Sequence, residues 1–125
     1  MIALCLSAGA LTTTLSIHAF TLAWMHSVEK IRWEEEWRIE GKELHLISAS
    51  VKGFGAGMEP PLGAIFKDGA WHYDPKVAPM QKVMLAHSPY TKGYEICFDL
   101  TCKPLADFLP HLKETDVITL EACER

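Results

Sequence analysis

Two neighbouring stretches of the chain alternate between apolar and polar residues with a period of two, which is typical of β-strands that bury one face. In the stretch 20–28, one face carries Phe20, Leu22, Trp24, His26 and Val28. In the stretch 33–39, one face carries Trp33, Glu35, Trp37 and Ile39, and the other carries Glu34, Glu36 and Arg38. Because few residues separate the two stretches, they predict an antiparallel hairpin with an apolar inner face.

Alternation and turn signals predict further short strands along the chain, at residues 3–7, 11–17, 43–52, 64–66, 71–73, 82–86, 94–98 and 117–122. In the stretch 43–52, one side is expected to carry Leu44, Leu46, Ser48 and Ser50, and the other His45, Ile47, Ala49 and Val51. A short helix is predicted at 104–112, where Pro104 suits the first turn and the apolar stripe consists of Leu105, Phe108, Leu109 and Leu112.

The predicted elements form a single domain over residues 1–125, because no linker or repeat divides the chain. With 49% hydrophobic and 22% charged residues, the composition is that of a globular protein. Many short strands with regular turns predict a mainly β fold, an antiparallel β-sandwich or small barrel with one short helix near the C-terminus. The Trp and Met side chains are expected in its core.

Charge and the N-terminal residues restrict partners and location. The net charge is −4, and no Lys/Arg cluster is present, so nucleic acid is not an expected partner. Residues 1–28 contain no Lys, Arg, Asp or Glu, so the positive start of a secretory signal is missing. Hydroxyl residues in this run, such as Thr12 and Thr13, favour two strands over a membrane helix. We therefore expect a cytoplasmic protein, with a periplasmic or membrane-associated location as the alternative.

The four cysteines allow two interpretations. None forms a Cys-x-x-Cys pair, so no structural zinc site is expected among Cys5, Cys97, Cys102 and Cys123. Cys97 and Cys102 could face each other across a hairpin and form a disulfide in an exported protein. The favoured interpretation is that all four cysteines are buried and reduced.

His26 and Glu35 are polar residues on apolar strand faces. A buried carboxylate needs a partner, or its pKa rises. An even-length turn at residues 29–32 would place Val28 opposite Trp33, His26 opposite Glu35 and Trp24 opposite Trp37. Directly opposed side chains can form a hydrogen bond. A structural hydrogen bond is the favoured interpretation, and a proton-transfer or ligand-binding pair is the alternative.

Other candidate sites are weaker. A metal site would need a third ligand besides this pair. Glu29 lies on the wrong strand face unless the turn twists it inward, and His87 is a possible ligand because it shares a face with Val83 and Leu85. No metal and no cofactor are expected. The glycines of the segment 53–57 favour a turn or a close backbone approach, and a backbone cradle for a small anion is the alternative.

Three motifs in order, "HSVE" from His26, "WEEEW" from Trp33 and "GAGMEPP" from Gly55, resemble the bacterial domain-of-unknown-function family DUF1850. The likeness runs from about Phe20 to Phe98. The family pattern falls on His26, Ser27, Glu29, Glu35, Gly55 and Gly57, which we take as candidate ligand-binding residues. The resemblance implies a small protein encoded beside, or fused to, TRAP-type transporters of the TAXI kind. No activity comes with this resemblance, so it carries over no catalytic residue.

Two functions follow as hypotheses. The first is an accessory or ligand-binding module that associates with components of a TRAP-type (TAXI) transporter or binds their solute. The second is a small hydrolase or isomerase that uses His26 as the base, oriented by Glu35. The exposed edges of the expected strands could also pair with a second copy of the chain.

Overall fold

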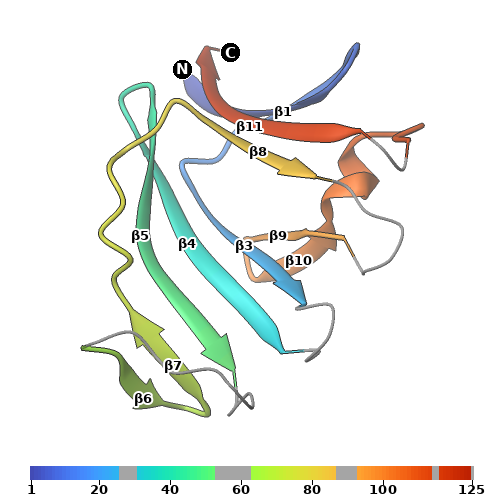
Figure 1. Cartoon of the computed structure of the whole chain (residues 1–125). Coiled ribbons are helices and arrows are strands. Elements are labelled where there is room, and N and C mark those ends of the chain that lie inside the picture. Colours follow the sequence, from blue (N-terminus) through green and yellow to red (C-terminus); the bar gives the residue numbers. More distant parts are fainter. Residues whose placement is uncertain (26–30, 53–62, 87–92, 114–115, 125) are drawn as a thin grey trace.

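The alternating segments pair into two antiparallel sheets that face each other as a β-sandwich (Figure 1). This is seen in a computed structural model that describes residues 1–25, 31–52, 63–86, 93–113 and 116–124. Neither sheet closes on itself within these residues. The mainly β prediction is therefore confirmed, in its sandwich form.

The smaller sheet brings the first and last strands of the chain together. Its four strands lie in the order β2-β1-β11-β8. They are β2 (Leu11–Leu15), β1 (Ile2–Ala8), β11 (Val117–Glu124) and β8 (Lys82–Ala86). All four lie within two residues of the predicted boundaries, and the N-terminal run forms the two predicted strands.

The larger sheet has seven strands in the order β10-β9-β3-β4-β5-β7-β6. They are β10 (Thr101–Pro104), β9 (Glu95–Phe98), β3 (Ala19–Met25), β4 (Arg32–Glu40), β5 (Glu43–Lys52), β7 (Ala70–Tyr73) and β6 (Ile65–Lys67). Strand β10 was not predicted, because its residues are exposed and carry no alternating pattern.

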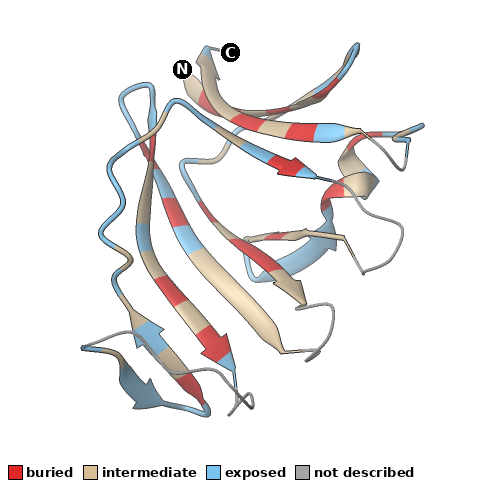
Figure 2. Cartoon of the chain, in the orientation of Figure 1, coloured by how far each residue is buried: buried red, intermediate tan, exposed pale blue. Residues whose placement is uncertain are grey.

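The core lies between the sheets and is entirely aliphatic at its best-buried positions. Leu4 and Leu6 of β1 meet Leu22 of β3, Ile96 of β9 and Leu120 of β11, and these five side chains are almost inaccessible to solvent. Each such burial contributes about 1.5–3 kcal/mol of hydrophobic free energy. The smaller sheet covers one end of the larger sheet, and β6 and β7 lie at the other end (Figure 1). On β4, the buried residues accordingly lie nearer the smaller sheet (Figure 2).

The helix prediction for residues 104–112 is wrong. Pro104 ends strand β10, and only residues Leu105–Phe108 turn, as a single 3-10 turn η1. Pro110 explains the early stop, because a residue before proline is excluded from helical geometry and Leu109 has φ −128° and ψ 80°. The apolar stripe still packs against the core, with Leu105 and Leu109 buried. No helix in the described residues is long and apolar enough to cross a bilayer.

The predicted faces of residues 43–52 are also partly wrong. The β4–β5 register shifts by one residue, so that Glu36 pairs with Ser48 but Trp37 pairs with Leu46. Ile47 is the extra residue of this bulge, and it is exposed. Because a one-residue shift exchanges the two faces of a strand, Leu44 is buried before the bulge while Ala49 and Val51 are buried after it.

The expectation of four reduced cysteines is wrong. Cys5 and Cys123 form a disulfide that joins β1 to β11, across 118 residues of sequence. Cys97 and Cys102 form a second disulfide between directly paired positions of β9 and β10, as the alternative interpretation expected. Both lie on outer faces, since Cys5 alternates with buried Leu4 and Leu6, and Cys97 follows buried Ile96.

The two disulfides should differ in their contribution to stability. In the chain-entropy view, closing 118 residues stabilises the fold by about 5 kcal/mol, and closing five residues by about 2 kcal/mol. We therefore expect the double variant Cys5→Ala/Cys123→Ala to lose clearly more free energy of unfolding than Cys97→Ala/Cys102→Ala. Urea denaturation under non-reducing conditions measures both. Equal losses, or the reverse order, would contradict this expectation.

Candidate functional site

The β3–β4 hairpin sets the geometry of the candidate site, and its predicted register is wrong. Trp24 pairs with Trp33, and Leu22, not His26, pairs with Glu35. Phe20, not Trp24, pairs with Trp37. The partner of each β4 residue therefore lies four residues earlier than predicted. An even shift keeps every side chain on its predicted face, so the faces are confirmed although the partners are not.

Glu35 lies between two stacked aromatic pairs. On one side, Phe20 and Trp37 stack with centroids 6.5 Å apart and planes at 7°. On the other side, Trp24 and Trp33 stack at 6.2 Å and 10°. The first pair is buried under the smaller sheet, whereas the second is only half-buried. The carboxylate therefore lies where the covered part of the inner face ends.

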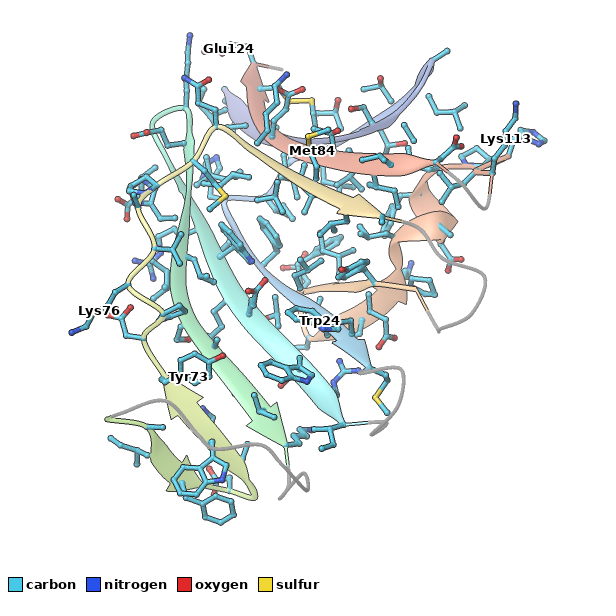
Figure 3. The ribbon with its side chains drawn as sticks, in the orientation of Figure 1. Trp24, Tyr73, Lys76, Met84, Lys113 and Glu124 are labelled. Carbon is cyan, nitrogen blue, oxygen red and sulfur yellow. A yellow bond between two sulfur atoms is a disulfide. The ribbon has the colours of Figure 1, made fainter. Side chains whose placement is uncertain are left out.

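The same inner face continues across β5 and β7. Glu35 pairs with Ala49, and Ala49 pairs with Tyr73, so these residues form one row across three strands. A parallel row runs Trp33–Val51–Trp71. Ala49, which lies between Glu35 and Tyr73 in this row, is buried. Trp24 and Tyr73 both lie in the part of the larger sheet away from the smaller sheet (Figure 3).

The Glu35 carboxylate has one described hydrogen-bond donor. The indole Nε1–H of Trp37 donates to its Oε1 at 3.3 Å. Desolvation by burial raises the pKa of Glu35 above its ordinary value, and the hydrogen bond from Trp37 opposes this with a smaller effect. None of the ion pairs formed within the described residues includes Glu35. The site therefore holds a negative charge that these residues do not neutralise.

Two tyrosines lie within the electrostatic reach of this carboxylate. Burial, and then the negative charge of Glu35, raise the pKa of both Tyr73 and Tyr94. The Tyr94 ring also lies against Trp24, with centroids 5.6 Å apart. The buried indole Nε1–H of Trp33 has no acceptor in the described structure. The site thus combines one carboxylate, several ring faces and one unpaired donor.

The outer face of the larger sheet contrasts with this site, because several of its carboxylates have polar or charged partners. Arg32 donates to Glu34 at 3.0 Å and to Glu95 at 2.7 Å, and the hydroxyl of Ser48 donates to Glu36 at 3.1 Å. A polar hollow of about 190 Å³ lies on this face. Its lining includes Glu34, Glu36, Ser48 and the Cys97–Cys102 disulfide. Unlike Glu35, the Glu34 and Glu95 carboxylates each contact the guanidinium of Arg32.

Of the six predicted ligand-binding residues, only Glu35 lies in the described structure. The predicted residues His26, Ser27, Glu29, Gly55 and Gly57 lie outside the described residues, as does His87. In the described ranges, no three His, Cys, Asp or Glu side chains gather in a group that could hold a metal ion.

Sequence reasoning did not place Trp24, Tyr73 and Tyr94 beside Glu35. The alternation put Trp24 on the correct face, but only the register brings it opposite Trp33. Tyr73 follows Trp71 at a spacing of two, which is a signal for a shared face. No local signal relates Tyr94 or Tyr73 to Glu35, because each comes from a distant part of the chain.

The comparison with protein families matches residues 20–105 to a family described as a domain of unknown function, DUF1850. The chain belongs to the DUF1850 family. No curated protein and no solved structure matches the chain. The DUF1850 match spans β3 to β10, and hence all the residues around Glu35, while β1, β2 and β11 lie outside it.

Replacing Glu35 by Gln should stabilise this DUF1850 protein at neutral pH. The folded-state pKa of Glu35 is raised, so its contribution is most favourable below the unfolded-state pKa and is lost as pH rises through the folded-state pKa. Gln keeps an acceptor for Trp37 and removes the desolvated charge. Since Glu35 is only half-buried, we expect a gain in Tm at pH 7 of less than about 5 °C.

Thermal unfolding between pH 3 and pH 8 measures this effect. The difference between Glu35→Gln and the wild type should shrink as the pH falls through the range in which Glu35 becomes protonated. Glu36→Gln is the matched control, since Glu36 lies on the exposed face of the same strand. A loss of stability in Glu35→Gln at pH 7 would show that the ionised carboxylate has a strong partner in the folded protein.

Proposed function

We propose that this DUF1850 protein is a ligand-binding accessory module of a TRAP-type (TAXI) solute transporter. The observation that carries the ligand-binding part is Glu35. It is a half-buried carboxylate, flanked by stacked aromatic pairs and held by one indole N–H at 3.3 Å. A desolvated charge lowers the stability of the fold. A function for such a carboxylate is to bind a ligand that offsets its charge.

The arrangement of the sandwich supports a ligand site at this place. Trp24, Trp33, Trp71 and Tyr73 are each only half-buried, although they lie on the inner face of the larger sheet. Aromatic side chains with a few polar groups are the usual lining of small-molecule sites. The rigid sheet holds these side chains in fixed positions through the paired strands β3, β4, β5 and β7.

The transporter part of the proposal rests on family membership. The resemblance that identifies this family implies small proteins encoded beside, or fused to, TAXI-type transporters. In its described part, the candidate site has the groups of a binding surface and no assembled set of catalytic groups. A solute-binding or accessory role fits such a site.

The predicted strand pairing that supported the alternative of a small enzyme is absent from the described structure. That alternative required His26 directly opposite Glu35, so that the carboxylate could orient the imidazole. The β3–β4 pairing places Leu22 at that position. Among the described residues, the hydrogen-bond donor to Glu35 is Trp37, and none of the described histidines contacts this carboxylate. We therefore do not propose hydrolase or isomerase activity.

We further propose that the protein works in an oxidising compartment, on the outer side of the cytoplasmic membrane. Two disulfides support this, because disulfides persist in oxidising compartments and are rare in the cytosol. This departs from the cytoplasmic expectation, which went with reduced cysteines.

Acid-quenched thiol alkylation of native cells, followed by mass spectrometry, tests the compartment. We expect all four cysteines to resist alkylation until a reductant is added. Free thiols at Cys97 and Cys102 in freshly quenched cells would contradict the proposal. The purified protein, oxidised and fully reduced, provides the two reference states.

Ligand binding is tested by thermal shift and tryptophan fluorescence against a panel of amines, amino acids, carboxylates and sugars. Binding of one class should raise Tm, and the variant Trp33→Leu should weaken that binding. A stabilising effect is expected because a ligand that binds only the folded state shifts unfolding by mass action. If no solute class binds, the ligand-binding proposal fails.

The transporter association is tested separately, by affinity purification of the tagged chain with the TAXI-type binding protein and membrane subunits of the same host. Copurification that survives washing with salt is the expected result. If the chain recovers neither component from cells that express both, the association fails even if a ligand has been found.

A further inference from the structure

We propose that the ligand held at Glu35 is a small organic cation of the quaternary ammonium class, bound between the carboxylate and the ring faces of Trp24 and Trp33. This inference rests on the proposed ligand-binding function and names its substrate class. It is argued from charge, from ring placement and from the hydrogen-bonding groups of the site.

The charge of Glu35 indicates the sign of the ligand's charge. The Glu35 carboxylate is partly desolvated, and none of the ion pairs among the described residues includes it. An anionic ligand would place a second negative charge in the same half-buried environment, where repulsion is screened less than in water. A cation instead offsets the desolvation of Glu35. The site therefore favours a positively charged ligand over a carboxylate or a phosphate.

The rings decide how the cation is held. Trp24 and Trp33 stack on one side of the Glu35 row. The ring centroid of Tyr94 lies 5.6 Å from that of Trp24, and the two ring planes make an angle of 53°. Tyr73 lies on the row of Glu35 itself, beyond the small side chain of Ala49. The negative ring faces of Trp and Tyr attract cations, with Trp the strongest. The site therefore combines the negative charge of one carboxylate with the faces of several aromatic rings.

The supply of acceptors favours a quaternary over a primary ammonium. A primary ammonium has three N–H groups that need acceptors once they leave water. The charged acceptor of the site is the Glu35 carboxylate, and its Oε1 already accepts from Trp37, whereas the hydroxyls of Tyr73 and Tyr94 are neutral acceptors. A quaternary ammonium has no N–H to satisfy, and its methyl groups can rest on ring faces. Recognition of such ions by aromatic side chains is a known use of this geometry.

The chain carries its own reporter for this test. It has four tryptophans, and all of them lie on or beside the candidate site. Trp33 and Trp37 flank Glu35 on β4, Trp24 is opposite Trp33, and Trp71 is in the row of Trp33. Binding at Glu35 should therefore change the intrinsic fluorescence.

Choline is the probe, and its neutral isostere 3,3-dimethylbutan-1-ol is the matched control, with sodium chloride used to equalise ionic strength. Choline should quench or shift the fluorescence saturably, and the isostere should not. Glu35→Gln should weaken choline binding by at least about tenfold, which is the usual loss when a charged partner is removed. Glu36→Gln, on the opposite face of β4, should bind as the wild type does.

A second variant keeps the test independent of charge removal. Trp24→Leu removes one ring but leaves Glu35 in place, and it should also weaken choline binding. Its fold is checked by circular dichroism before titration. Equal binding of choline and the isostere, or full binding by Glu35→Gln, would overturn the inference.

Failure of this inference is distinguishable from failure of the proposed function. If choline does not bind but a neutral or anionic solute does, and Trp33→Leu weakens that binding, the ligand class is wrong and the binding function stands. If no solute of any class binds, both fail.

Discussion

The pairing register between β3 and β4 is the constraint on which the candidate site depends. It places Trp24 against Trp33, Leu22 against Glu35 and Phe20 against Trp37. These pairs hold the Glu35 carboxylate in an apolar row with stacked rings on both sides. Stacked aromatic pairs across strands add about 0.5–1.5 kcal/mol each beyond their burial, so the rings also stabilise the register that positions the charge.

The candidate site lies where the smaller sheet no longer covers the inner face of the larger sheet. The smaller sheet has four strands and the larger has seven, so one end of the larger sheet's inner face lies beyond the sandwich core. Trp37 and Phe20 are buried, and Trp24 and Trp33 are half-buried. The carboxylate lies at this boundary, where it is half-buried and its charge is partly desolvated. The two disulfides lie on the outer faces of the sheets, and the Cys5–Cys123 bridge ties the N-terminal strand to the C-terminal strand.

Much of the fold could be predicted, and the errors have separate physical causes. The strand Glu43–Lys52 was predicted with its observed bounds, but a bulge at Ile47 exchanged its faces, and such a bulge has no local signature in this sequence. The apolar stripe from Leu105 correctly indicated burial, but Pro110 limited it to one 3-10 turn. The pairing of Cys97 with Cys102 was expected only as the alternative to four reduced cysteines. The partner of Cys5 is distant in sequence, so pairing with Cys123 required the order of the sheet.

The sequence by itself determined which residues of β3 and β4 share a face. The period of two places Glu35 with Trp33 and Trp37 on the inner side of β4, and that assignment survives any even shift of register. Only the tertiary structure decided which residues meet. Leu22 rather than His26 opposes Glu35. Tyr73 of β7 and Tyr94, which directly precedes β9, interact electrostatically with Glu35 from distant parts of the chain. The physical reason is that alternation is a local property of one strand, whereas register, bulges and sheet order depend on pairing between strands, which the packing of the whole sandwich selects.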